Sequence, residues 1–152
     1  YMEYGEHVNY DGTAFRVMRE QESLNAIPTY EVTTREGKIY QFEGTHLKRY
    51  KDLNGNEIVY EYGSNNRLLR IIDTAGRTVY LYYRSDGRLE RITYPGVSGA
   101  VTLIYGYDSG KDLNRVVDPA NRMTVYAYTQ IATGAGATGL SKLLTSITYP
   151  SY

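Results

Sequence analysis

Short runs of β-branched and aromatic residues alternate along this chain with short runs in which apolar and basic residues mix. Residues 57–62 (EIVYEY) and 77–83 (RTVYLYY) are of the first kind, and residues 67–73 (RLLRIID) and 112–118 (DLNRVVD) are of the second. Turn-forming segments such as GSNN, SDG and DSGKD lie between them. This order is typical of consecutive antiparallel hairpins and predicts an all-β fold.

A sustained helical period of apolar residues is found nowhere in the sequence. The nearest approach is residues 15–27 (FRVMREQESLNAI). This segment fits one helical stretch, but Phe15, Val17 and Met18 also suit a strand. Both interpretations stay open at this point.

Three landmarks recur in the same order about five times. The first is a pair of aromatic residues separated by one residue, with Leu in place of one member at residues 81–83. The second is Leu followed three residues later by a branched or aromatic residue, and the third is Asp or Tyr two residues further on, before a turn. The five leucines are 21, 21, 24 and 31 residues apart. The positions that define the repeat are Tyr40, Phe42, Leu47, Asp52, Gly55, Tyr60, Tyr62, Leu68, Asp73, Gly76, Tyr83, Leu89, Ile92, Tyr105, Tyr107, Leu113, Asp118, Tyr126, Tyr128 and Leu144.

The longer spacings predict loop insertions near residues 95–101 and 131–140, both rich in small residues. At the ordinary turns the Asp carboxylate is expected to accept a backbone N–H two residues on, while Gly supplies a positive φ. After Asp118, Asn121 stands where Gly would be, a position that Asn tolerates better than most residues.

The tyrosines of one pair, such as Tyr60 and Tyr62, share a face of their strand because side chains alternate. Stacked hairpins would therefore align the tyrosines as a ladder. Leu68 and Ile71 have opposite parity. Either the leucine belongs to the turn or a β-bulge lies between them.

Composition narrows the function classes. Of 152 residues, 18 are Tyr, two are Phe and none is Trp or Cys, and 17 basic residues balance 17 acidic ones. So many tyrosines predict aromatic faces that are half wet. Zero net charge argues against a nucleic-acid partner, and no apolar run approaches the ~18 residues needed for membrane insertion. The lack of cysteine excludes a disulfide framework or a thiolate metal site.

Candidate chemistry is sparse, and we assign no catalytic residue, cofactor or metal site. The histidines, His7 and His46, are interpreted as surface or half-packed residues. Residues 52–57 (DLNGNE) carry alternating oxygen ligands, but the spacing of a calcium loop is missing and a turn explains the same residues. Residues 134–139 (GAGATG) are expected to form a loop rather than a phosphate cradle. The sequence places no two of six glutamates at a working distance for glycoside hydrolysis: Glu6, Glu20, Glu22, Glu31, Glu57 and Glu61.

The landmarks resemble the YD repeat of RHS proteins, a family of large bacterial polypeptides that are secreted or attached to the cell surface. The match is clearest over residues 60–96 and 105–128, and residues 30–44 resemble the hairpin that precedes such arrays. The resemblance implies a YD-repeat array over residues 30–152, after a lead-in or capping segment over residues 1–29.

The resemblance also implies a curved, partly open β-sheet strip that forms part of a shell around a toxin domain. The opening residues do not look like a native start, so we expect a piece of a longer protein. The leading hypothesis is a non-enzymatic wall, whose partners are the neighbouring repeats and the enclosed toxin. A carbohydrate-binding or adhesion module is the alternative: tyrosines buried between layers would favour the wall, and an exposed row would favour glycans. About five repeats leave open strand edges, which predicts self-association unless residues 1–29 and the terminal ITYPSY blunt them.

Overall fold

The computed structural model describes residues 2–8, 14–20, 27–132 and 140–151, and the side chains of residues 27–131 and 142–151. These residues form thirteen β-strands and no helix, so the predicted all-β hairpin fold is confirmed. The strands are β1 (Met2–Val8), β2 (Ala14–Glu20), β3 (Thr29–Thr34), β4 (Ile39–Glu43), β5 (His46–Lys51), β6 (Glu57–Tyr62), β7 (Leu68–Asp73), β8 (Thr78–Tyr83), β9 (Leu89–Gly96), β10 (Gly99–Tyr107), β11 (Leu113–Val117), β12 (Met123–Ala132) and β13 (Leu140–Thr148).

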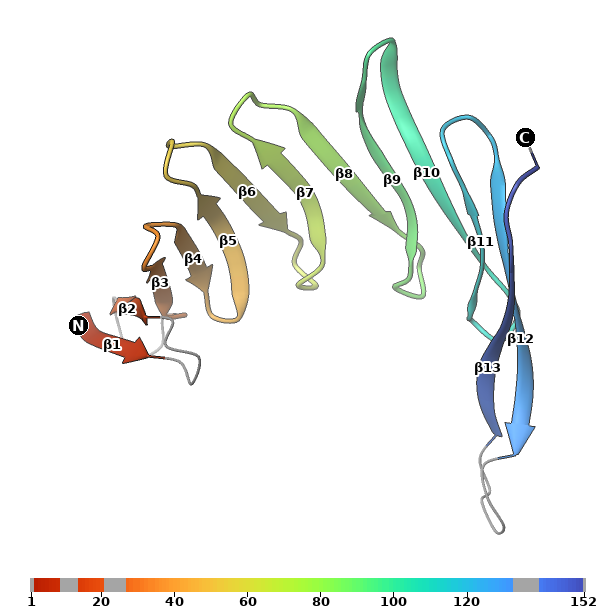
Figure 1. The fold of residues 1–152 in the computed structure, drawn as a ribbon, viewed down its shortest axis with the longest axis horizontal. Helices are drawn as coiled ribbons and strands as arrows, with labels where there is room; N and C mark the ends of the chain where they lie inside the picture. Colours follow the sequence, from red (N-terminus) through yellow and green to blue (C-terminus); the bar gives the residue numbers. More distant parts are fainter. Residues whose placement is uncertain (1, 9–13, 21–26, 133–139, 152) are drawn as a thin grey trace. The chain divides into compact units, whose positions relative to one another are not determined.

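Each strand pairs with its neighbours in the chain, antiparallel wherever the register is defined, so the order in the open sheet follows the sequence (Figure 1). The chain divides into two units, Tyr1–Tyr80 and Leu81–Tyr152, and the division falls inside β8. Such ladders satisfy the backbone hydrogen-bonding groups without any long connection.

The segment that could be helix or strand is a strand over the part that the structure describes. β2 lies antiparallel to β3, with Val17 opposite Val32 and Phe15 opposite Thr34. β1 pairs with β2 in turn. The lead-in segment therefore extends the sheet of the repeats rather than forming a separate element.

Seven hairpin turns share one backbone pattern. In the turn that starts at Asp73, the Asp73 N–H donates to the Arg77 carbonyl (3.1 Å) and the Gly76 N–H donates to the Asp73 carbonyl (2.9 Å). This is a type I turn followed by one residue in the left-handed region, a common connection in hairpins. The left-handed residues of the seven turns are Gly37, Gly55, Asn66, Gly76, Gly87, Lys111 and Asn121.

The predicted role of the aspartates in these turns is confirmed. The Oδ1 atom of Asp73 accepts the N–H groups of Ala75 (3.0 Å) and Arg77 (2.9 Å). Asp118 does the same with Ala120 and Arg122. The carboxylate thus fixes two backbone donors that the turn leaves without a backbone acceptor. The Asp52 carboxylate has this turn role too: its Oδ1 atom accepts two backbone N–H groups and its Oδ2 atom accepts the side-chain amide of Asn56.

Replacing Gly76 with Val is expected to lower the free energy of unfolding by about 1–2 kcal/mol. A Cβ atom on Gly76 would have open space around it, but the residue has φ +77°, so backbone strain alone produces the loss. Asn121→Gly, at φ 59°, is the matched control and should change stability little. Urea unfolding monitored by circular dichroism measures both variants. Equal stability of Gly76→Val and the parent chain would contradict the assignment of strain.

The prediction of a loop insertion near residues 95–101 is wrong, because the extra residues lengthen two paired strands. Residues 89–96 and 99–107 are strands, and only Val97 and Ser98 connect them. Tyr94 stands where Asp ends the strand in other repeats, and its side chain offers no carboxylate to the turn, so pairing continues to Gly96 opposite Gly99. At the second predicted insertion, near residues 131–140, extra residues likewise belong to β12 and β13. Residues 133–139, which include the GAGATG segment, lie outside the described residues.

A β-bulge explains the parity of the leucine landmark. Opposite β6, residues Tyr60, Glu61 and Tyr62 face Ile71, Arg70 and Leu68, so Leu69 is the extra residue. Leu68 and Ile71 therefore lie on the same face, the second of the two alternatives that the sequence left open. The same shift leaves one extra residue in three other strands, and the four extra residues are Lys48, Leu69, Asn114 and Thr145.

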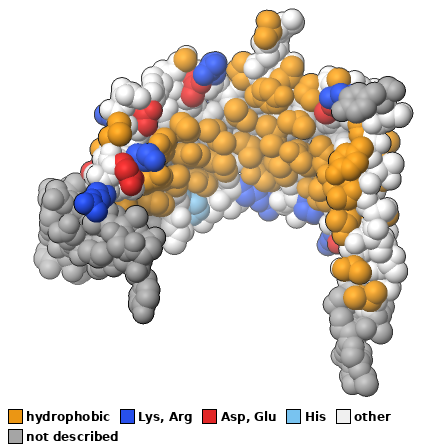
Figure 2. All heavy atoms as spheres, viewed as in Figure 1, with side chains coloured by type: hydrophobic (Ala, Val, Ile, Leu, Met, Phe, Trp, Pro, Cys, Tyr) orange, Lys and Arg blue, Asp and Glu red, His pale blue; other side chains and the backbone are white. Residues whose placement is uncertain are grey.

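The registers separate an apolar face from a polar face within each unit. On β6, Ile58, Tyr60 and Tyr62 share the apolar face, while Glu57 and Glu61 belong to the polar face. Figure 2 shows hydrophobic side chains gathered over strands of both units. The described residues include no buried hydrophobic side chain, because no second layer of these residues covers the sheet. The apolar face is only half-buried, as the tyrosine content predicted.

The tyrosines do not form a continuous ladder across the sheet. Tyr40 and Tyr50 do pack together, with ring centroids 5.0 Å apart. Tyr60, however, lies opposite Ile71, and Tyr126 lies opposite Ile147. The prediction is wrong at these places because each strand with paired tyrosines lies between two strands of the leucine type.

Candidate functional site

Three tyrosines make the same hydrogen bond at equivalent positions of the repeat. The Tyr62 hydroxyl donates to the Leu47 carbonyl (3.0 Å), Tyr107 to Leu89 (2.8 Å) and Tyr128 to Leu113 (2.8 Å). Each bond joins the second aromatic landmark to the leucine landmark of the preceding strand. Both landmarks therefore meet at one structural feature, which we call the tyrosine clasp.

The tyrosine clasp lies where two strands diverge. Backbone pairing between β5 and β6 runs only from Lys51 to Arg49, so the Leu47 carbonyl lies beyond the end of that ladder. The register between β11 and β12 also ends, at Arg115, before Leu113 is reached. A tyrosine side chain is long enough to bridge the gap, and its hydroxyl satisfies a carbonyl that the ladder leaves open.

A basic side chain lies over the ring of Tyr107, one of the two clasp tyrosines in the C-terminal unit. The guanidinium carbon of Arg88 lies 4.8 Å from the centroid of the Tyr107 ring, and that of Arg84 lies 5.9 Å from it. Arg88 also pairs with Asp86, yet its Nη1 atom is buried without a hydrogen-bond acceptor. The electron-rich ring face stabilises this guanidinium. Burial raises the pKa of the Tyr107 hydroxyl, so the donor stays protonated at neutral pH.

The clasp of the N-terminal unit borders an open groove. His46 meets the Tyr62 ring edge-on with centroids 4.7 Å apart, and the Lys48 ammonium lies 5.6 Å from the ring centroid. Lys48 also pairs with Glu43 (3.2 Å). The groove has a volume of about 440 Å³, and Asn66 adds a further polar side chain to its lining. His46 is half-packed, as predicted, and the side chain of His7 lies outside the described residues.

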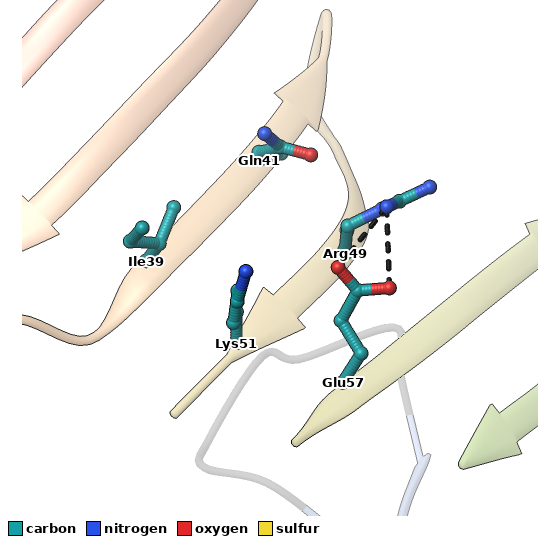
Figure 3. A pocket seen from close by; sticks show the side chains of 5 residues that line it. All are labelled: Ile39, Gln41, Arg49, Lys51 and Glu57. Carbon is teal, nitrogen blue, oxygen red and sulfur yellow. Dashed lines mark hydrogen bonds and ion pairs between the residues drawn. The ribbon is translucent and has the colours of Figure 1, made fainter. Parts of the chain in front are cut away.

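The polar face of the N-terminal unit has a smaller hollow of about 250 Å³ (Figure 3). Arg49 donates through Nη1 to both carboxylate oxygens of Glu57, at 3.1 and 3.2 Å. Gln41 donates to Glu31 (2.9 Å), so its amide is also engaged. Lys51 and Ile39 complete the lining. These cross-strand pairs stabilise the polar face, and their exposure keeps each contribution small.

A lysine of the last strand joins two carboxylates of an earlier turn. Lys142 on β13 pairs with Asp112 and, at 3.6 Å, with Asp108. The hydrogen bond to Asp112 is the main cause that raises the pKa of the Lys142 ammonium. The contact ties the terminal hairpin to the turn between β10 and β11.

The described side chains include no metal-binding group. They contain no group of three or more His, Asp or Glu residues that could hold a metal ion. Three of the six glutamates considered for glycoside hydrolysis have described side chains, and each has a separate partner: Glu31 binds Gln41, Glu57 binds Arg49 and Glu61 binds Arg70. The side chains of Glu6, Glu20 and Glu22 lie outside the described part of the chain.

Sequence reasoning found the residues of the tyrosine clasp but missed their bond. Tyr62 and Tyr128 each follow their leucine by 15 residues, and Tyr107 follows Leu89 by 18 because the hairpin between them is three residues longer. This spacing, which changes only with the length of the intervening hairpin, is the signal in the sequence that could have predicted the bond.

In the described part of the chain, no helix is long and apolar enough to cross a membrane. Comparison with models of protein families and with curated proteins found no match.

Proposed function

We propose that this chain is a YD-repeat segment of the RHS type that forms part of the β-shell of a large bacterial protein, secreted or at the cell surface. In this proposal the segment is not an enzyme. Its repeats hold neighbouring repeats in register and form a wall around a toxin domain.

The recurrence of one structural solution carries the proposal. The same turn, the same bulge and the same tyrosine clasp return along the chain, and no repeat gathers three or more His, Asp or Glu side chains that could hold a metal ion, among the side chains that the structure describes. A single hairpin cannot bury its own apolar face, so stacking with neighbours is what stabilises each copy. A chain built in this way extends a surface rather than enclosing one reactive centre.

The contrast between the two faces supports an enclosing role. One face carries half-buried Tyr, Leu and Ile side chains, and the other carries cross-strand ion pairs such as Arg49–Glu57 and Arg70–Glu61. An exposed apolar face of this extent marks a surface that contacts another part of a protein, and the charged face suits contact with water. Tyrosines buried between layers would favour the wall, and an exposed row would favour a glycan-binding module. The tyrosines are half-buried, so their burial alone does not distinguish the two.

A carbohydrate-binding module remains the second candidate, and the groove beside Tyr62 favours it. The groove combines an aromatic ring with His46, Lys48 and Asn66, side chains that hydrogen-bond sugar hydroxyls. The ring edge contact with His46 covers part of the tyrosine, which weakens this candidate.

Duplication of one repeat tests the wall. A second copy of residues 63–83, inserted after Tyr83, adds a complete turn, β7, a second turn and β8. The longer protein is expected to fold, and its urea m value should rise in proportion to length, by about 14%. A matched control inserts residues 64–83, one residue fewer, which reverses the faces and should destabilise the sheet.

A duplicated chain that is no more stable to urea than the control would refute the additive wall. Binding of the parent chain to a glycan array, lost in Tyr62→Ala but kept in Tyr60→Ala, would favour the carbohydrate-binding alternative.

A further inference from the structure

The last strand, β13, is the exposed edge of the described sheet. It pairs with β12 on one side, and no described strand pairs with its other side. Its described apolar side chains are exposed, with Leu143 at 53%, Leu144 at 44% and Ile147 at 42%. A long edge strand with apolar side chains is a template for further pairing.

The register shows which half of a repeat β13 represents. Ile147 lies opposite Tyr126, as Ile71 lies opposite Tyr60 and Val116 lies opposite Tyr105. The bulge of β13 also falls at the equivalent place. β13 is thus a strand of the leucine type. Of the four earlier strands of this type, three are followed by a strand with the full aromatic pair, and the fourth is followed by β8, where Leu81 replaces one member.

The equivalent inner strands indicate the direction of the unused backbone groups. The N–H of Asp73 points toward the following strand and donates to the Arg77 carbonyl. The N–H of Asp118 donates in the same way to the Arg122 carbonyl. Tyr149 holds the same repeat position as these aspartates, and Ile147 precedes it by two residues. Because N–H directions alternate along a strand, the N–H groups of Ile147 and Tyr149 face the open edge.

The edge also presents an acceptor that is used in the inner repeats. The carbonyls of Leu47, Leu89 and Leu113 each accept a tyrosine hydroxyl from the following strand. Leu144 holds the equivalent position, and no described tyrosine donates to its carbonyl. The β13 edge therefore offers backbone donors together with one specific site for a hydroxyl group.

We propose that the β13 edge binds an extended strand of another polypeptide segment that carries a Tyr-x-Tyr pattern, with the second tyrosine donating to the Leu144 carbonyl. This inference rests on the proposed wall and deepens it by defining the partner at one edge. A second copy of the chain is a poorer occupant, because β6, β10 and β12 already have strands on both sides.

A labelled peptide tests the edge directly. The fluorescein-labelled peptide RMTVYAYTQ, residues 122–130, has the sequence that pairs with β11 and places its Tyr128 hydroxyl on Leu113. Fluorescence anisotropy is expected to show saturable binding to the full chain. The matched peptide with Tyr128→Phe lacks only the hydroxyl and should bind about fivefold more weakly, the effect of one net hydrogen bond.

A variant of the protein locates the binding. Ile147→Pro removes an N–H that faces the open edge, a position where edge strands accept proline, and should abolish peptide binding while the circular dichroism spectrum is kept. Full peptide binding to this variant, equal affinity of the two peptides, or no saturable binding would each overturn the proposal. If the variant does not fold, the comparison of the two peptides decides. A dimer in light scattering that the peptide fails to dissociate would also overturn it, since a second copy would then hold the edge.

The two proposals can fail separately. A duplicated repeat that folds, together with a peptide that does not bind, rejects only the docking edge. A failed duplication rejects the additive wall, whatever the peptide does.

Discussion

Replacing Tyr107 with Ala is expected to lower the free energy of unfolding by about 2–4 kcal/mol, the largest effect that we expect from one substitution in this chain. The change removes a half-buried ring and the hydrogen bond to the Leu89 carbonyl. It also takes away the ring face over which the Arg88 guanidinium lies, at 4.8 Å. Arg88 Nη2 pairs with Asp86, but Nη1 has no hydrogen-bond acceptor, so the guanidinium would lose the ring contact that stabilises its buried side.

Urea unfolding of the parent chain, Tyr107→Ala and Tyr107→Phe measures the loss of stability and separates the contribution of the hydroxyl from that of the ring. Tyr107→Phe keeps the ring and removes only the hydroxyl, so it should cost about 1 kcal/mol. Tyr107→Ala should cost clearly more than Tyr107→Phe. If both substitutions cost the same, the ring and its contact with Arg88 contribute nothing, and the stabilising role given to the ring is wrong.

Acidification is expected to lower the midpoint of thermal unfolding, most steeply below about pH 4. Hydrogen bonds hold the pKa of several turn aspartates below the ordinary value of 3.8. The main cause is a side-chain bond from Asn56 for Asp52 and from Arg77 for Asp73. A side-chain bond from Arg88 lowers the pKa of Asp86 to about 2.

The sign follows from linkage. A carboxyl group whose pKa is lower in the folded state contributes stability above its unfolded pKa and loses that contribution as pH falls through the folded pKa. The contribution is therefore complete above about pH 4 and lost as pH approaches 2. The same direction holds for Asp108, through the backbone N–H of Asp112, and for Asp118, through the side chain of Arg122.

Thermal unfolding at a series of pH values from 5 to 2 tests this expectation. Asp86→Asn keeps a side-chain oxygen but cannot titrate, so it should flatten part of the pH dependence. An unfolding midpoint that does not change between pH 5 and pH 2 would show that the turn carboxylates have the same pKa in the folded and unfolded chain.

The features that the sequence predicted correctly are local. The turn at Asp73 depends on a carboxylate, two backbone N–H groups and a left-handed Gly76, all within five residues. Such a unit is specified by neighbouring residues whatever the rest of the chain does. The alternation of strand and turn, and hence the all-β fold, could be predicted for the same reason.

The features that the sequence left open or did not predict depend on partners far away in the sequence. The bulge at Leu69 becomes visible only when β7 is set against β6, and the hydrogen bond from Tyr62 to Leu47 joins two strands. The lengthened hairpin after Tyr94 was taken for a loop because composition alone cannot distinguish small residues in a strand from small residues in a turn. The sequence could not decide whether the tyrosine rows form a wall or bind glycans. That choice depends on whether a second layer buries them, which is a property of the whole protein.

The pairing of each strand with its neighbour in the chain has a consequence for how the protein forms. Residues in contact are separated by few positions, so the chain has a low contact order and closes only short loops as it folds. No strand has to wait for a distant partner. Each hairpin can add to the preceding one as it leaves the ribosome, and the sheet can grow during synthesis from β1 toward β13.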